Sequence, residues 1–357
     1  MNIKSLFLLG TVSFIVFACN KDEDKEEFDR GAMLTNMASA VIEPSYTEMN
    51  NQLISLHSSA VDFTASPTAA SLNVLKDGFV SAYLSFQHCK MYNFGPMMDY
   101  GVKNAMNTYP ADTAIIESNI SSGSYTLGSV SNITAIGLPA IDYLLYTSDE
   151  VTVLNSFTVD ANAGNRKTYL TDITQKMKEE YALAVSAWSN YKADFIAADG
   201  NDVSSSTTLL FNEFVKDIEL LKNAKIGIPA GYKSGGQVLP DYVEGYYSQI
   251  SILLAKESIV GLTNAFNGGT GLGFDDYIKD VEGEEVSPSL VDNINAQFTL
   301  CDQKVSAIGT PLSEKVNTNS TAVSEAYAEI KKLVTYCKTD MSSTLGLLIT
   351  YQDNDGD

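Results

Sequence analysis

The segment from Gly137 to Tyr146 carries a single acid, Asp142, into an otherwise apolar run. It opens with Gly137 and Pro139, and a proline in the first turn is typical of a helix start. A carboxylate on such an apolar face is costly to bury unless it is paired or hydrogen-bonded. Most buried acids have a structural role, so these residues alone favour a hydrogen-bonded aspartate, with a functional group as the alternative.

The chain has only two histidines, His57 and His88, and this scarcity limits its chemistry. A three-histidine zinc site is impossible, and a serine–histidine–aspartate triad would have to use one of the two. The sequence contains neither a GxSxG nor an HExxH motif. The glycines at 268–273 follow a predicted helix and precede no Lys-Ser or Lys-Thr, which favours helix termination over a phosphate-binding loop.

A second polar group, formed by Glu244, Ser248 and Ser251, falls in a segment predicted to be helical from 241 to 266. At spacings of four and three residues these side chains would share one helix face. The structural interpretation is that they satisfy helix ends and buried polar groups at a domain junction. The functional interpretation is that this polar stripe faces Asp142 and Tyr92 across a shared cleft.

Helical periodicity dominates the rest of the chain. Apolar residues recur at three and four, and Gly or Pro ends most runs, which predicts helices at about 33–57 with a break at Pro44, and at about 68–93, 112–120, 165–197, 205–224, 289–308 and 320–348. The apolar loop at 95–112 is expected to fold back over the core. Clear alternation is absent, so we predict an all-α protein made of two helical bundles packed against each other.

The first 18 residues have the features of an export signal. Lys4 precedes an apolar run from Leu6 to Ala18, which is too short to span a bilayer. The run ends in VFAC, which resembles a bacterial lipoprotein box and makes Cys19 the predicted lipid anchor. A plain secretory signal is the alternative. Acids at 22–24 resemble the signal that directs some lipoproteins to the cell surface, so we predict an outer-membrane lipoprotein, either periplasmic or surface-exposed.

These patterns divide the chain into four parts. They are a signal peptide at 1–18, an acidic tether at 19–32, an N-terminal bundle at 33–155 and a C-terminal bundle at 156–357, with the connection within 148–165. The formal charge of −21 opposes binding to nucleic acid or to anionic lipid by charge. After Cys19, three cysteines remain, at 89, 301 and 337, and the last two are the plausible pair if a disulfide forms.

Four segments, in their order along the chain, resemble the imelysin family of bacterial envelope proteins. They are FQHCKMYNFGP at 86–96, GLPAIDYLL at 137–145, YVEGYYSQIS at 242–251 and the closing stretch at 345–357. The resemblance covers nearly everything from about residue 35, and four ordered segments are more specific than any one of them. It implies two helical bundles with a functional site at their junction, association with iron uptake, and an old classification as metallopeptidases.

The family's Gly-x-His-x-x-Glu motif aligns here with Gly137, Pro139 and Asp142. Residues at i and i+3 on a helix point the same way, so the family's histidine and glutamate can meet one metal ion. Pro139 offers no ligand atom, and Asp142 has a shorter side chain than glutamate. The metal site that the resemblance implies is therefore degraded. His88, from another matching segment, is the alternative imidazole, and Glu244 is a weak second acid.

We therefore predict a lipid-anchored, non-catalytic envelope protein that binds a metal ion or small nutrient at the bundle junction and works with envelope uptake proteins. No cofactor is assigned, and iron or another divalent cation is the candidate ligand. A metallopeptidase is the first alternative, although a zinc peptidase needs about three protein ligands, a water and a general base. An adhesion or scaffold lipoprotein without a small ligand is the second.

Overall fold

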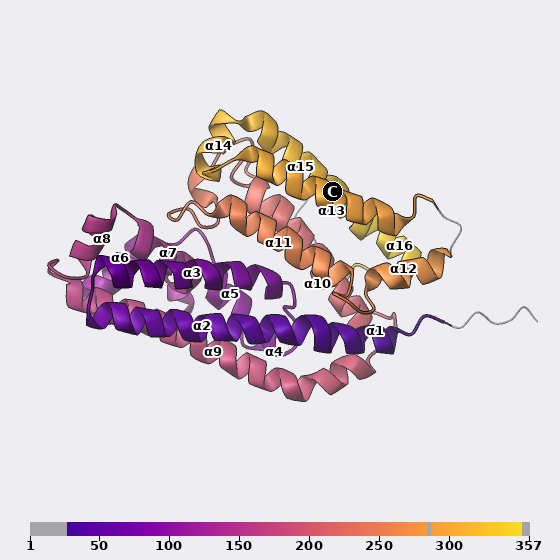
Figure 1. Ribbon diagram of the computed structural model, residues 1–357, viewed down its shortest axis with the longest axis horizontal. Coiled ribbons are helices and arrows are strands. Elements are labelled where there is room, and N and C mark those ends of the chain that lie inside the picture. Colours follow the sequence, from indigo (N-terminus) through magenta and orange to yellow (C-terminus); the bar gives the residue numbers. More distant parts are fainter. Residues whose placement is uncertain (1–26, 284–286, 352–357) are drawn as a thin grey trace, which may run out of the picture.

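The computed structural model describes residues 27–283 and 287–351. The predicted signal peptide, the anchor Cys19, most of the acidic tether and the end of the closing stretch lie outside these ranges. Within them the regular structure is helical and contains no strand, which confirms the all-α class. Figure 1 shows two groups of helices packed side by side, the earlier part of the chain in one and the later part in the other. No helix in these ranges is long and apolar enough to cross a membrane.

The first long rod of the N-terminal bundle is continuous through Pro44. It consists of α1 (Arg30–Asn36), a π-helical stretch η1 (Met37–Ile42) and α2 (Glu43–Ala65). The predicted break at Pro44 is wrong because this residue lies in the first turn of α2, just after the wider π turns. A missing N–H at the point where the hydrogen-bond register changes does not end the helix.

The rest of this bundle packs around α2. The long helices α3 (Ala69–Cys89) and α9 (Ala163–Ala197) lie along it. Between them, the chain forms short helices that cover the core: α4 (Pro96–Asp99), α5 (Val102–Asn107), α6 (Thr113–Ser122), η2 (Val130–Ala135), α7 (Gly137–Tyr146) and α8 (Glu150–Ser156). The predicted loop at 95–112 thus contains α4 and α5 and does fold over the core, with Met97 and Met106 buried.

The position of α9 bears on the domain boundary. This helix packs along α1, α2 and α4, whereas the predicted division after residue 155 assigns it to the C-terminal bundle. We propose that the chain passes to the second bundle after Ala197, the last residue of α9. Figure 1 shows α9 beneath α2 in the lower group of helices.

The C-terminal bundle is built from the later helices. They are α10 (Ser206–Leu220), η3 (Leu221–Gly227), η4 (Pro240–Tyr242), α11 (Ser251–Phe266), α12 (Phe274–Glu282), α13 (Leu290–Ile308), α14 (Leu312–Thr318), α15 (Ser320–Thr335), η5 (Tyr336–Met341) and α16 (Ser342–Leu345). Helix α13 packs along α15 and α11. Cys301 on α13 and Cys337 in η5 are buried free thiols in the structure, as is Cys89.

The prediction of a helix over 241–266 is wrong for its first third. Residues 243–250 form turns, and α11 begins only at Ser251. Gly245 has φ of +64° and Gln249 has φ of +62°, in the left-handed region that a right-handed helix cannot include. Glu244 and Ser248 therefore do not share a helix face with Ser251. We call residues 243–250 the junction loop.

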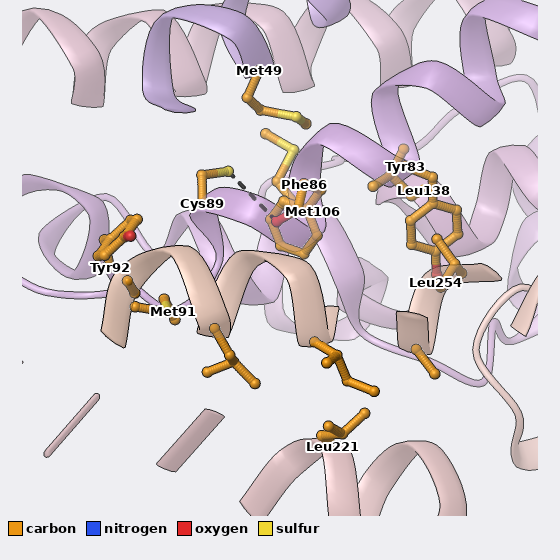
Figure 2. Close-up of a cluster of buried hydrophobic side chains, with 14 of the residues drawn as sticks. Met49, Tyr83, Phe86, Cys89, Met91, Tyr92, Met106, Leu138, Leu221 and Leu254 are labelled. Carbon is orange, nitrogen blue, oxygen red and sulfur yellow. Dashed lines mark hydrogen bonds between the residues drawn. The ribbon is translucent and has the colours of Figure 1, made fainter. Parts of the chain in front are cut away.

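The two bundles share one hydrophobic core. Figure 2 shows Met49 of α2 and Phe86 of α3 in the same buried cluster as Leu221 of η3 and Leu254 of α11. Helices α3 and α11 approach closely at Gly261, where an added Cβ would lie 3.0 Å from the carbonyl oxygen of Gln87. The junction is therefore packed like a protein interior along α3, and any ligand space lies beside this contact.

Candidate functional site

The start of α7 depends on a glycine. Gly137 has φ of +76°, and a Cβ on it would lie 2.6 Å and 2.5 Å from the carbonyl oxygens of Ala105 and Met106 at the end of α5. Only glycine accepts both this backbone conformation and such close contact. The first residue of the motif thus seats α7 against α5 and directs the next turn, which carries Asp142, toward the second bundle.

Asp142 connects α7 with the junction loop. Its side chain is buried, with only 2% of the residue exposed. The backbone N–H of Tyr247 donates to Oδ2 and that of Ser248 donates to Oδ1, each at 2.9 Å. Burial raises the pKa of Asp142 to about 6, although these hydrogen bonds oppose the shift. Both carboxylate oxygens are therefore used in holding the junction loop against the N-terminal bundle.

Pro139 and Asp142 line a cavity of about 260 Å³ that is rich in aromatic residues. Tyr109, Tyr242, Tyr246 and Tyr247 contribute to its wall, and Asp241 is its second acid. Pro139 offers this cavity a ring without a donor or acceptor atom. We call it the tyrosine cavity.

Glu244 lies in the same loop but belongs to a different polar cluster. Its carboxylate is ion-paired with Lys225 of η3 and is 2% exposed. Asn107 donates to Oε1 at 2.6 Å and Gln87 at 3.1 Å, so elements of both bundles surround it. Burial lowers the pKa of Lys225 well below its ordinary value, and the nearby charge of Lys90 adds to this effect.

A second ion pair lies next to the first. Lys90, just after α3, pairs with the fully buried Asp217 of α10, and Lys103 of α5 is 3.8 Å from the same carboxylate. Burial alone would raise the pKa of Asp217, but the charges of Lys90 and Lys103 outweigh it and the pKa is lowered. Together with Lys225 and Glu244, these side chains line a cavity of about 270 Å³ between the bundles. We call it the lysine cavity; it shares Tyr109 and Tyr242 with the tyrosine cavity.

Two of the predicted site residues lie elsewhere. His88 Nε2 is 2.8 Å from Glu257 Oε2 in a separate, half-exposed cavity of about 470 Å³, which Tyr92 also lines. The Tyr92 ring is buried in an aromatic cluster beside Tyr46 and Phe94. Neither residue lines the tyrosine cavity, so the predicted arrangement of Asp142 facing Tyr92 is not formed.

The other predicted residues do meet at the junction. Gly137, Pro139 and Asp142 lie on α7, and Ser248 joins them through its backbone N–H, which donates to Asp142. Ser251 is buried at the first turn of α11, and its hydroxyl has no hydrogen-bond partner among the described residues. The contacts of the motif acid Asp142 are therefore structural, and the buried charged side chains line the adjacent lysine cavity.

Sequence reasoning missed the lysines and Asp217. A signal was available, because Asp217 follows Phe214 by three residues and precedes Leu221 by four, which places an acid on the apolar face of α10. Lys225 continues that face after one more turn. Charged residues in phase with buried ones indicate a paired or functional group. Lys90 shows the same signal, because it follows the buried Phe86 by four residues. Lys103 shows none, because it lies in the predicted loop at 95–112 and its element meets Asp217 only in the folded chain.

The metal that the family resemblance implies does not fit these residues. Pro139 has no ligand atom, Asp142 already accepts two backbone hydrogen bonds, and Glu244 is neutralised by Lys225. Across the described ranges, no group of three or more His, Cys, Asp or Glu side chains is arranged to hold a metal ion.

Comparisons with known proteins agree with this architecture. The chain is 20% identical over 297 residues to Iron-regulated protein A of Synechococcus elongatus, covering 79% of this chain and 78% of that protein. A putative iron-regulated protein A precursor from Parabacteroides distasonis has a similar fold, with a TM-score of 0.75, 17% identity, and coverage of 88% of this chain and 95% of that one. An imelysin-like protein from Psychrobacter arcticum gives a TM-score of 0.72 at 16% identity, covering 90% and 97%.

A family profile also matches most of the chain. The profile described as Imelysin aligns with residues 42–336, which run from the end of η1 to the start of η5. That range includes α7, the junction loop and both cavities. The protein whose motif carries Pro139 in place of histidine therefore belongs to the imelysin family.

Proposed function

We propose that this protein is a lipid-anchored, non-catalytic binding protein of the cell envelope that takes a small ligand at the bundle junction and serves uptake of iron or another nutrient. The observation that carries the proposal is that structural and charged residues occupy separate places at the junction. The motif acid Asp142 is used to hold the junction loop, whereas Lys90, Lys103 and Lys225 line an adjacent cavity with two acids. A cavity with apolar walls and a few convergent polar groups is typical of small-molecule binding sites.

The link to iron rests on the relatives. Two of the similar proteins are named iron-regulated protein A, one from Synechococcus elongatus and one from Parabacteroides distasonis. The envelope location rests on the sequence of the first 24 residues, with Cys19 as the lipid anchor. The partners we propose are the membrane, through that lipid, and envelope proteins that pass the ligand on.

The metallopeptidase alternative requires a hydrolytic metal centre. Zinc peptidases hold the ion with about three protein ligands and leave a position for water. Here the histidine position of the motif is Pro139, and His88 pairs with Glu257 away from Asp142. The scaffold alternative requires no ligand at all. Detection of a bound ligand therefore separates binding from the scaffold, and a peptide-cleavage assay separates binding from the peptidase.

Native mass spectrometry of the full chain, purified in detergent from iron-limited and iron-replete cells, tests the proposal. We expect a small molecule to remain bound to the wild type and to be lost from Ala224→Phe, because Ala224 lines the lysine cavity and the larger side chain fills it. Ala182→Phe, on the exposed face of α9, is the matched control and should keep the ligand.

Two outcomes would replace this function. Chelator-sensitive peptide cleavage that disappears in Asp142→Ala would establish the metallopeptidase. Absence of any retained ligand in the wild type under both growth conditions would favour the scaffold.

The anchor is tested separately by fractionation. Cys19→Ala should move the protein from the membrane fraction to the soluble fraction. Loss of the wild-type protein when intact cells are treated with protease would support surface display, and full protection would place it on the periplasmic side.

A further inference from the structure

By formal count, the lysine cavity is lined by one more basic than acidic side chain. Its wall contains Lys90, Lys103 and Lys225, against Asp217 and Glu244. Lys225 is paired with Glu244, and Lys90 is paired with Asp217. Lys103 is the remaining cation, in a protein whose formal charge is −21. A surplus of positive charge between the bundles of so acidic a chain favours a negatively charged ligand.

Lys103 and Asp217 face each other in this cavity without forming a hydrogen bond. Lys103 Nζ is 3.8 Å from Asp217 Oδ1, which is too far for a hydrogen bond. Asp217 Oδ1 has no hydrogen-bond partner among the described residues, although its side chain is only 1% exposed. A buried carboxylate oxygen without a hydrogen-bond donor costs desolvation free energy, so a ligand that donates to this atom would be stabilised.

The cation on the other side of the gap is also incompletely satisfied. No side chain or carbonyl of the described residues accepts a hydrogen bond from Lys103 Nζ, and burial lowers the pKa of this lysine. An anionic oxygen placed beside it would restore the stabilisation that the charged form loses on burial. A single bridging water would satisfy both atoms but would leave the surplus charge uncompensated.

A ligand that fills the gap must present an anionic acceptor next to a hydroxyl donor. We propose that the lysine cavity binds a small hydroxycarboxylate, with a carboxylate oxygen on Lys103 and the neighbouring hydroxyl donating to Asp217. This inference rests on the proposed function and names the ligand class of the same site. Phe86 and Leu220 supply apolar walls for the carbon skeleton.

The dimensions of the cavity agree with this class. Its volume of about 270 Å³ is close to the lower end of the range of about 300–1,000 Å³ that is typical of small-molecule sites. The cavity therefore suits a compact organic acid better than a peptide. The side-chain amide of Asn104 in the same wall is a further donor for a carboxylate oxygen, whereas the Thr108 hydroxyl already donates to the carbonyl oxygen of Asn104 at 2.8 Å.

Isothermal titration calorimetry of the detergent-solubilised full chain tests the inference with three probes: citrate, tricarballylate and inorganic phosphate. Tricarballylate has the carboxylates of citrate without its hydroxyl. We expect citrate to bind. Tricarballylate should bind with an affinity at least about tenfold lower, because Asp217 Oδ1 then stays without a donor. Lys103→Gln should weaken citrate binding by about tenfold or more. Lys331→Gln, on the exposed face of α15, should leave it unchanged.

The possible results separate this inference from the function on which it rests. Equal affinity for citrate and tricarballylate would overturn the hydroxyl contact, and tighter binding of phosphate would overturn the carboxylate. If no probe binds while Ala224→Phe still loses a ligand retained from cells, the anion inference fails and the proposed function stands. If no probe binds and no ligand is retained, both fail.

Discussion

Two buried acids at the junction, Asp142 and Glu244, are stabilised in different ways. Asp142 is held by backbone N–H groups of the junction loop, whereas Glu244 is held by the charge of Lys225. Backbone dipoles offset part of the cost of burying a charge, and an ion pair offsets it with a second buried charge. The two acids should therefore respond differently to pH and to substitution.

Asp142 should make the stability of the protein depend on pH below about 6. Its pKa rises from an ordinary value of 3.8 to about 6 on folding, so the folded state binds this proton more tightly than the unfolded state. The stabilisation is then fully present below pH 3.8 and is lost as the pH rises to about 6. At about 1.4 kcal/mol per pH unit, the loss is about 3 kcal/mol.

Urea unfolding of the wild type and of Asp142→Asn between pH 4 and pH 8 measures this effect, since asparagine does not titrate. The free energy of unfolding of the wild type, relative to the variant, should fall up to about pH 6 and then stay constant. A relative stability that rises with pH in this window would mean that the hydrogen bonds to the carboxylate outweigh its burial.

The Glu244–Lys225 pair should show strong coupling. Glu244→Gln leaves a buried lysine without its counter-charge and should lower the free energy of unfolding by about 3–5 kcal/mol. Lys225→Met should cost a similar amount, and the double variant should cost clearly less than the sum of the two. Chemical denaturation gives all three values. Glu325→Gln, which removes the more exposed partner of Lys304, should cost less than about 1 kcal/mol.

At the scale of elements, α7 is positioned by its first residue. Gly137 lets the helix begin against the last carbonyl groups of α5, and this contact aims Asp142 at the junction loop. The junction loop in turn ends where Gln249, in a left-handed conformation, turns the chain into α11. Two local backbone features thus bring the two halves of the junction together.

Gly137→Ala should therefore be strongly destabilising. The new Cβ would lie 2.5 Å from the carbonyl oxygen of Met106, which cannot move without displacing α5, and the residue would also be strained at φ of +76°. We expect the free energy of unfolding to fall by about 3 kcal/mol or more.

Gly101→Ala is the matched control, because Gly101 has φ of +64° with nothing within 4 Å of its Cβ position. It should lose only about 1 kcal/mol, from strain alone. Equal losses would show that the contact with α5 is unimportant.

At the scale of the whole molecule, one core runs through both bundles. The cluster in Figure 2 joins α2 and α3 with η3 and α11, and the backbones of α3 and α11 approach closely at Gly261. Apolar area shared in this way is lost by both bundles if either one opens. The two bundles should consequently unfold together.

Trp188 provides a direct measurement of this cooperativity. It is the only tryptophan of the chain and is buried in α9, so its fluorescence reports on the N-terminal bundle, whereas far-ultraviolet circular dichroism reports on all helices. The two denaturation curves of the wild type should coincide. Gly261→Leu, which forces α3 and α11 apart, should separate them. Separate transitions in the wild type would contradict a shared core.

The helical class was predictable because it depends on local periodicity. Apolar residues at helical spacing, such as Leu72 and Phe79 on α3, define a side of the helix that is buried whichever element packs against it. The same holds for Val305 on α13. Predictions failed where a few backbone angles decide the outcome. Pro44 did not end its helix, and residues 243–250 did not start one, because a π turn and two left-handed residues override the side-chain pattern.

Residue types and their spacing were enough to predict an all-α fold, to show the resemblance to the imelysins and to reveal the missing histidine of their motif. The composition of the site could not be predicted in this way. Lys90, Lys103 and Lys225 come from three separate elements, and their meeting with Asp217 depends on how two bundles dock. Charge pairing acts over a few ångströms, so partners more than a hundred residues apart in sequence become visible only when the chain is folded.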